Sequence, residues 1–254
     1  MSTLIAVAHG SRDPRSARTV ATVVDRIRAR RPDLDVRVAF LDLTEPSVED
    51  VVDDVVAGGA EAAVIVPLLL GSAFHARVDL PAIVDAARRR HPRSTLVQSE
   101  VLGDDRLLVD ALRDRILEAG VESDDPDIGI AVAAVGSSSA PANLRACALA
   151  ERVRFGTSWR AAVTCFATAP SPGPAESLTR LRAAGARTLV VAPWFLAPGL
   201  LTDRVSGAID TYTRDAPLTE VRLASVLGDH ALVAEVVSNR YDAAARRLHT
   251  RRSA

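Results

Sequence analysis

Side chains that can bind a metal follow several predicted strands in the first half of the sequence. His9 comes directly after the apolar run 4–8, and Asp42 ends a second apolar run, with Glu45 shortly after it. His75 lies in the loop after a third run. Two imidazoles and one carboxylate are a plausible ligand set for a divalent transition metal, and they leave coordination positions open for a reaction. A single histidine after a strand is most often a capping or hydrogen-bonding residue, and it is the joint placement of the two that favours metal binding.

The elements that position these residues alternate between strands and helices. Apolar residues at helical spacing, such as Val20, Val24 and Ile27, predict helices, and Asp13 followed by Pro14 marks a helix start. Valine-rich apolar runs predict the strands of the first half at residues 4–8, 36–41, 63–69 and 95–99. This alternation predicts an α/β fold with a mainly parallel, four-stranded sheet flanked by helices.

The sequence contains an internal repeat. Residues 6–14 resemble 131–141, residues 58–78 resemble 183–205, and residues 99–112 resemble 224–237. An offset of 126 residues separates Gly10 from Gly136 and, to within a residue, relates the other matches. We therefore predict two similar domains, residues 1–123 and 127–254, joined by a polar stretch that contains Pro126.

The internal repeat helps to distinguish a folding role of the two histidines from a functional one. In open parallel sheets, ligands bind beyond the carboxyl ends of the strands, and the predicted strands deliver His9, Asp42 and His75 to that edge. The second half has Val135 and about Leu201 at the positions of the two histidines. Histidines that served folding would be needed in both halves. We therefore predict one functional site, in the first domain, with the second domain lacking the histidines.

Other features exclude several classes of protein. The 254 residues carry a net charge of −1, so no basic surface indicates nucleic-acid binding. The longest uncharged stretch, 188–202, contains two prolines and is shorter than the about 20 residues of a membrane helix. Cys147 and Cys165 lack CxxC spacing, and no basic segment precedes the first apolar run. We expect a cytoplasmic protein with neither nucleic-acid nor membrane partners.

Three further histidines lie outside the predicted metal site. His91, His230 and His249 are interpreted as structural or neutral residues.

A phosphoryl-transfer enzyme with its histidine in an HG loop is a rival interpretation. Such enzymes usually have Arg before that histidine, and here the residue is Ala8. The sequence therefore argues against this activity.

Four segments together resemble the sirohydrochlorin chelatases, the class II tetrapyrrole chelatases that insert Fe²⁺ or Co²⁺. The segments are AHGSRDPRS, FLDLTEPS, VPLLLGSAFHARVDLP and PWFLAPGLLTDRV. The resemblance covers nearly the whole chain and includes the long, two-domain members of the family. It implies a tandem of chelatase-like α/β domains with a cleft between them, and a lyase of sirohaem or cobalamin biosynthesis.

The resemblance implies that His9 and His75 bind the metal and act in catalysis. The family often has Glu at the position of Asp42, whose shorter side chain places the carboxylate about one methylene further back. Glu45 could bind the metal instead, or it could simply begin the next helix. Both alternatives stay open.

The resemblance further implies a tetrapyrrole substrate that carries several carboxylates, which guanidinium and N–H groups can bind. The candidates for binding them are Ser11, Arg12, Arg77, Ser137 and Arg204. Trp194 and Phe195 could lie against the ring, although aromatic residues there are more often part of the core. The metal is itself a substrate, and no organic cofactor is expected. A non-catalytic carrier of metal or tetrapyrrole would use the same residues and is the alternative. The fused repeat favours a monomer that acts as a pseudo-dimer.

Overall fold

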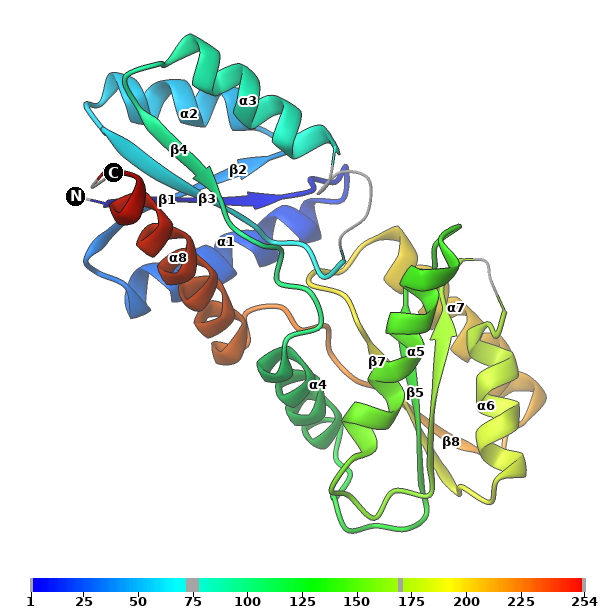
Figure 1. The fold of residues 1–254 in the computed structure, drawn as a ribbon. Coiled ribbons are helices and arrows are strands. Elements are labelled where there is room, and N and C mark those ends of the chain that lie inside the picture. The colour runs from blue at the N-terminus through cyan, green and yellow to red at the C-terminus, as the bar shows by residue number, and fades with distance from the viewer. Residues whose placement is uncertain (1, 72–77, 169–170, 253–254) are drawn as a thin grey trace. The chain divides into compact units, whose positions relative to one another are not determined.

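The chain forms two compact units, each built on its own parallel sheet (Figure 1). The computed structural model describes residues 2–71, 78–168 and 171–252, with side chains up to residue 247. The first unit contains Met1–Leu107 and Asp229–Ala254, and the second contains Leu108–Gly228. In the described residues, no helix is long and apolar enough to span a membrane.

The sheet of the first unit has the strand order β2-β1-β3-β4, with every neighbouring pair parallel. Its strands are β1 (Ser2–Ala8), β2 (Leu34–Phe40), β3 (Ala62–Pro67) and β4 (Thr95–Gln98). Its helices are α1 (Pro14–Arg30), α2 (Val48–Ala57), α3 (Leu80–Arg90) and α8 (Ala231–Arg252). These strands agree with the predicted runs to within a few residues, and the predicted α/β fold is confirmed.

The sheet of the second unit has the equivalent order β6-β5-β7-β8 and is also parallel. Its strands are β5 (Ile128–Ala134), β6 (Ala161–Phe166), β7 (Thr188–Pro193) and β8 (Glu220–Leu223). Its helices are α5 (Ala140–Arg154), α6 (Pro174–Ala183), α7 (Leu200–Asp215) and most of α4 (Arg106–Glu118). The identical strand order of the two sheets is the structural form of the sequence repeat.

Local sequence signals set the helix boundaries in the first unit. The Asp13 carboxylate accepts a hydrogen bond from the Arg15 N–H, and Pro14 occupies the first turn of α1, as predicted. Ser47 caps α2 in the same way, and Gly58 ends it. Asp79, at the start of α3, makes no side-chain capping bond because its backbone is already helical.

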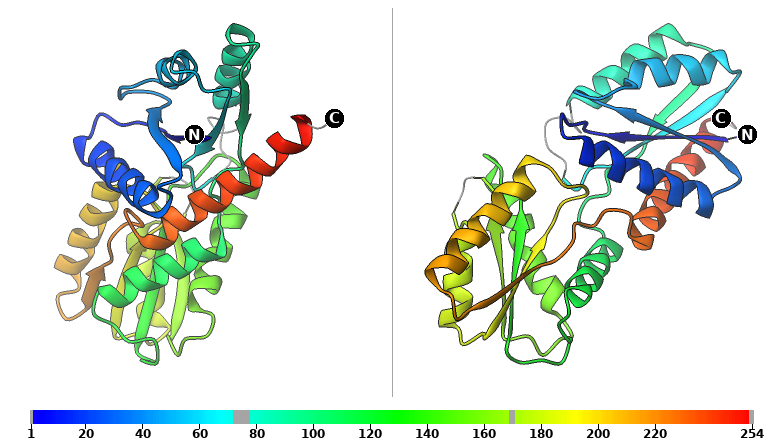
Figure 2. Two further views of the ribbon diagram at one scale, coloured as in Figure 1. Left: turned by 90° about the vertical axis from the view of Figure 1, so that its left-hand side faces the viewer. Right: turned by 180° about the vertical axis from the view of Figure 1, so that it is seen from behind.

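Helices cover both faces of the first sheet. The apolar residues of α2 and α3 pack on one face, where Val48, Val52 and Val84 join Ile5 and Ile65 in one core cluster. Helices α1 and α8 lie side by side on the other face (Figure 2). Burial on both faces explains why the central strands are almost entirely apolar.

Helix α8, the last helix of the second repeat, belongs to the first unit. The guanidinium group of Arg240 on α8 donates to the carbonyl oxygens of Val101 and Leu102, each at 2.9 Å. Arg31, at the end of α1, forms an ion pair with Asp242 at 2.8 Å and lies over the Tyr241 ring at 5.2 Å. These contacts tie α8 to the sheet of the other repeat.

Helix α4 makes the complementary exchange. It is the last helix of the first repeat, yet Arg113 on α4 donates to the carbonyl oxygens of Arg152, Val153 and Phe155 at the end of α5. The sequence repeat divides the chain into residues 1–123 and 127–254, whereas the compact units of the structure change over after Leu107 and after Gly228. The two divisions differ because each unit takes its fourth helix from the other repeat.

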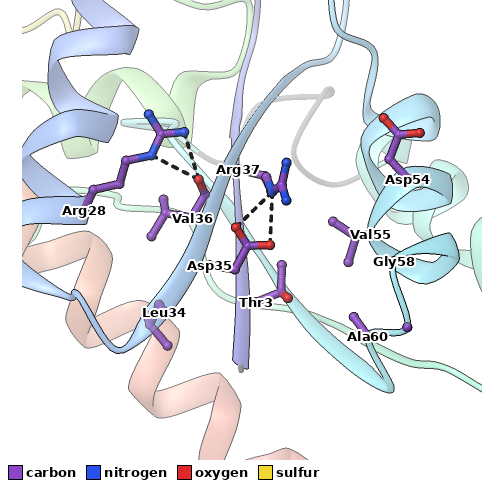
Figure 3. A pocket seen from close by; sticks show the side chains of 11 residues that line it. Thr3, Arg28, Leu34, Asp35, Val36, Arg37, Asp54, Val55, Gly58 and Ala60 are labelled. Carbon is purple, nitrogen blue, oxygen red and sulfur yellow. Dashed lines mark hydrogen bonds and ion pairs between the residues drawn. The ribbon is translucent and has the colours of Figure 1, made fainter.

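Arginine side chains cover the outer strands of the first sheet. Arg28 on α1 donates to the Val36 carbonyl oxygen at 2.9 Å (Figure 3), and Arg88 on α3 donates to the Leu96 carbonyl oxygen at 2.8 Å. The first contact lies on edge strand β2 and the second on edge strand β4. Such contacts occupy backbone acceptors that could otherwise pair with another chain.

The two cysteines differ in reactivity. Cys165 on β6 is buried, and this burial raises the pKa of its thiol to about 12, whereas Cys147 on α5 is exposed. Because the thiolate is the reactive form, we expect an alkylating reagent at about pH 8 to modify Cys147 alone in the native protein, and both thiols after unfolding. Mass spectrometry of the alkylated protein counts them. Equal labelling rates in the native protein would contradict this expectation.

Ser177 on α6 carries a buried hydroxyl group without a hydrogen-bond partner among the described residues. Such a group costs about 1–3 kcal/mol. We expect Ser177→Ala to raise the free energy of unfolding by about 1 kcal/mol in urea titrations. Ser238→Ala is the matched control, because this buried helical hydroxyl donates to the Ala234 carbonyl oxygen at 2.8 Å. A gain in stability from both substitutions would refute the explanation.

Candidate functional site

Two loops meet at the carboxyl edge of the first sheet. The Leu41 N–H donates to the Ala8 carbonyl oxygen, and the Asp42 N–H donates to the His9 carbonyl oxygen, each at 3.0 Å. These bonds continue the pairing of β1 with β2 past the ends of both strands. The structure therefore brings the backbones of His9 and Asp42 together, where the sequence placed them.

Gly10 allows this close approach. Its φ is 94°, in the left-handed region, and a Cβ atom built on it would lie 1.6 Å from the Asp42 carbonyl oxygen. That separation is far below any non-bonded contact. Only a residue without a side chain fits between the two loops.

A second connection involves Thr44, which sequence reasoning did not single out. The Ser11 N–H donates to the Thr44 hydroxyl oxygen at 3.0 Å, and that hydroxyl donates to the Ser11 carbonyl oxygen at 3.0 Å. The Phe40 N–H also donates to the Pro46 carbonyl oxygen at 2.9 Å, which closes the loop after β2. The loop that carries Asp42 is therefore fixed at several points.

The candidate side chains themselves face water. His9, Asp42 and Glu45 are exposed, and His9 Nδ1 lies 3.3 Å from the Gly10 carbonyl oxygen. The Asp42 Oδ1 atom accepts a hydrogen bond from the Leu43 N–H at 2.8 Å. Exposed imidazole and carboxylate groups at a strand end are accessible to a metal ion and to a substrate.

The remaining candidates of this unit differ in their surroundings. The Ser11 hydroxyl oxygen accepts a hydrogen bond from the Asp13 N–H at 3.0 Å, so this group helps to shape the loop. Arg12 is exposed and forms no ion pair within the described part of the chain. His75 and Arg77 lie outside the described residues. The loop that leads to them leaves β3 beside β1, since the Leu68 N–H donates to the Val7 carbonyl oxygen at 2.7 Å.

Residues 2–71, 78–168 and 171–252 contain no group of three or more His, Cys, Asp or Glu side chains arranged to hold a metal. The predicted set of His9, His75 and a carboxylate includes one residue outside these ranges. The metal-binding and catalytic roles of these residues stay predictions.

The other histidines have structural surroundings. His91 ends α3, and its Nε2 atom lies 2.7 Å from an Asp53 carboxylate oxygen. Hydrogen bonds from His91 and Arg90 hold the pKa of Asp53 below its usual value. The His230 Nδ1 atom accepts a hydrogen bond from the Leu232 N–H at the start of α8. The side chain of His249 lies outside the described residues.

The second repeat builds the same pair of loops with different side chains. The Thr168 N–H donates to the Val135 carbonyl oxygen at 3.0 Å, and the Phe166 N–H donates to the Pro172 carbonyl oxygen at 2.9 Å. These bonds are equivalent to those of Asp42 and Phe40 in the first repeat. Both repeats also have a cis peptide bond before the proline of this loop and a positive φ at the glycine after the first strand.

The chemistry differs although the framework is shared. Val135 stands at the position of His9, Thr168 at that of Asp42, and Ser171 at that of Glu45. Two repeats with the same backbone hydrogen bonds thus differ in the residue types that could bind a metal. Folding of these loops requires neither the imidazole nor the carboxylate.

The candidates in the second unit lie at the carboxyl edge of its sheet. Ser137, after β5, donates its N–H to the Asn143 side-chain oxygen at 2.9 Å, and its hydroxyl oxygen accepts from the Ser139 N–H at 3.1 Å. Arg204 on α7 is exposed. Trp194 and Phe195 are buried, with 6% and 9% of their surface exposed, so they belong to the core.

Two hollows lie at opposite ends of the first sheet. The loop after β2 lines a hollow of about 310 Å³ that includes Asp42, Leu43 and Glu45. A larger hollow of about 690 Å³ lies at the amino end of β1 and β2, with Thr3 and Arg37 among its lining residues (Figure 3). The larger hollow is remote from His9 because it lies at the other end of the same strands.

Comparison with known proteins agrees with these features. A Priestia megaterium protein named sirohydrochlorin cobaltochelatase is 27% identical over 94% of this chain and 79% of its own length. A second protein of that organism, named sirohydrochlorin ferrochelatase, is 28% identical over 94% of this chain and 89% of its own length. The structure of SirB from Bacillus subtilis with Fe³⁺ superposes with a TM-score of 0.85 and 24% identity, over 98% of this chain and 97% of that one.

The similarity to SirB confirms the tandem α/β fold over nearly the full length. The family model CbiX matches the sequence twice, at residues 3–119 and 129–244, once in each repeat. Together the two matches include most of the sequence and reproduce the repeat found in it. This chain belongs to the CbiX family.

Proposed function

We propose that this protein is a sirohydrochlorin chelatase, a lyase that exchanges two pyrrole N–H protons of sirohydrochlorin for Fe²⁺ or Co²⁺. The observation that carries the proposal is the contrast between the repeats. One loop framework occurs twice, and only the first copy carries His9, Asp42 and Glu45. The names of the most similar relatives support the same activity.

The reaction needs groups that hold the metal, release it and accept protons. Imidazole binds metals when neutral and titrates near physiological pH, so one residue type can do all three. His9 holds the incoming ion through a ring nitrogen and takes up a pyrrole proton once the ion has moved to the macrocycle. His75 is proposed as the second such residue. The balance is one M²⁺ bound and two protons released for each substrate.

A carboxylate would offset the charge of the ion while it is held. Asp42 is the better candidate, because its backbone is bonded to His9 and its carboxylate is oriented by the Leu43 N–H. Glu45 lines the same hollow and lacks such a link to His9 among the described contacts. Asp42→Asn is therefore expected to slow metallation more than Glu45→Gln.

The substrate carboxylates need cationic and hydrogen-bond donors. We assign this role to the residues predicted from the sequence: Arg12, Arg77 and Arg204 through their guanidinium groups, and Ser11 and Ser137 through their hydroxyl groups, because the N–H groups of the two serines already donate to Thr44 and Asn143. The exposed position of Arg12 supports its part. We further propose that the protein acts in the cytoplasm, in agreement with its two free cysteines, and as a monomer whose repeats replace the two chains of a dimer.

The test is an anaerobic metallation assay. The protein is mixed with sirohydrochlorin and Fe²⁺ or Co²⁺, and the absorption change of the macrocycle is compared with the rate without protein. Catalytic turnover with either metal supports the proposal. Stoichiometric binding of metal or tetrapyrrole without any rate enhancement would refute it and identify a carrier instead.

A further inference from the structure

Leu43 combines two features that rarely occur in one apolar residue. Its φ is 61°, and it is the only non-glycine residue with a positive φ in the part of the chain that the structure describes. Its surface is also 50% exposed. A left-handed backbone is unfavourable for leucine, and an exposed leucine contributes little to a core. The fold therefore gains nothing evident from this residue.

The surrounding loop holds Leu43 in this conformation. Its own N–H donates to Asp42 Oδ1 at 2.8 Å, and the preceding Asp42 N–H is bonded to His9. The next residue, Thr44, makes two hydrogen bonds with Ser11. Strained residues persist where neighbouring bonds fix them, and they are concentrated at functional sites.

The position of Leu43 indicates that its side chain contacts a ligand. Together with Asp42 and Glu45 it lines the hollow at the carboxyl end of β2. An apolar group therefore stands beside the carboxylates proposed to assist metal binding. A tetrapyrrole is complementary to this arrangement. Its apolar ring face can contact the leucine, and the nitrogens at its centre can take up the metal.

Comparison of the two repeats indicates that the role of Leu43 is limited to the first repeat. The offset of 126 residues places Ala169 at the sequence position of Leu43. Leucine thus occurs in the repeat that carries His9 and is replaced, as His9 is, in the repeat that lacks it. A residue required only for the loop would be expected in both.

We propose that Leu43 contacts the apolar face of the tetrapyrrole and helps to bind the macrocycle beside His9 and Asp42. This inference rests on the proposed chelatase activity. The loop holds the leucine in a strained conformation in order to present its side chain to the substrate, and burial of that side chain by the ring contributes to binding.

The experiment compares three variants of the full-length protein. Leu43→Asn keeps the number and branching of the side-chain non-hydrogen atoms and tolerates a positive φ, but it is polar. Leu43→Met stays apolar and of similar size. Leu218→Asn is the matched control, because Leu218 is 97% exposed and lies in the turn before β8. This turn is at the amino end of the second sheet, whereas the candidate residues lie at carboxyl ends of strands. Cobalt insertion gives kcat and KM for sirohydrochlorin, and calorimetry gives Tm.

For Leu43→Asn we expect KM for sirohydrochlorin to rise roughly tenfold with kcat little changed. The lost apolar contact would stabilise the bound substrate and the transition state equally, so its loss weakens binding without slowing the chemical step. Its Tm should rise by about 2 °C as the backbone strain is relieved. Leu43→Met and Leu218→Asn should keep KM within about twofold of the original value.

Two results would overturn the inference while the original protein remains an active chelatase. One is an unchanged KM in Leu43→Asn. The other is a Tm that falls in Leu43→Asn together with a loss of kcat, which would show that the leucine supports the loop and not the substrate. Absence of turnover in the original protein would instead refute the proposed function itself, so the two failures are distinguishable.

Discussion

His9→Ala should reduce the rate of enzymatic metallation by a factor of roughly 100 or more, the usual contribution of a positioned acid or base. The exposed imidazole follows β1 directly, and the second repeat folds the equivalent loop with Val135. The loss should therefore come from chemistry, with the free energy of unfolding almost unchanged. Initial rates with Co²⁺ and a parallel urea titration measure the two quantities.

His91→Ala is the matched control for this substitution. That imidazole is hydrogen-bonded to Asp53, on the side of the sheet covered by α2 and α3, and its removal should leave the metallation rate intact. Added free imidazole should restore part of the rate of His9→Ala. If His9→Ala retains the original rate, or loses it only because the protein unfolds, the assignment of His9 is wrong.

Gly10→Ala should damage both folding and activity. The new methyl group would overlap the Asp42 carbonyl oxygen, 1.6 Å from the ideal Cβ position, and alanine is also unfavourable at a φ of 94°. Left-handed strain and forced overpacking together should lower the free energy of unfolding by about 3 kcal/mol. The two loops must separate, so His9 and Asp42 lose their relative positions and the metallation rate should fall at least about 100-fold.

Gly59→Ala separates the two causes. Gly59 also has a positive φ, 89°, but no atom lies within 4 Å of its ideal Cβ position. This control should lose only about 1 kcal/mol from backbone strain and should keep its activity. Equal losses in Gly10→Ala and Gly59→Ala would show that the close approach of the loops has no special importance.

Much of this arrangement could be predicted from local patterns. Apolar runs predicted the strands, the Asp13–Pro14 pair predicted the start of α1, and the repeat predicted two equivalent sheets. The rule that parallel strands present their carboxyl ends at one edge then predicted that His9 and Asp42 would lie together, and their backbones are hydrogen-bonded. Such predictions succeed because strand direction and hydrophobic periodicity are properties of short segments.

Details of the site could not be predicted in this way. The bonds between Ser11 and Thr44, the close contact at Gly10 and the positive φ of Leu43 all occur where two loops meet that are distant in the sequence, Ser11 and Thr44 being 33 residues apart. Ser, Thr and Leu are common in loops and carry no signal of such pairing. The aromatic pair Trp194 and Phe195 was ambiguous for a similar reason, and its burial was decided by packing around β7.

The sequence by itself determined the number and order of strands and helices, the duplication, and the restriction of His9, Asp42 and Glu45 to one copy. Tertiary structure decided which sheet each terminal helix covers. Helix α4 lies in the unit of the second sheet and α8 in that of the first, so each repeat is completed by the other. The physical reason is that two nearly equivalent sheets offer similar apolar faces. Local sequence makes α4 and α8 amphipathic, but specific long-range contacts, such as those of Arg240 and Arg113, select the partner.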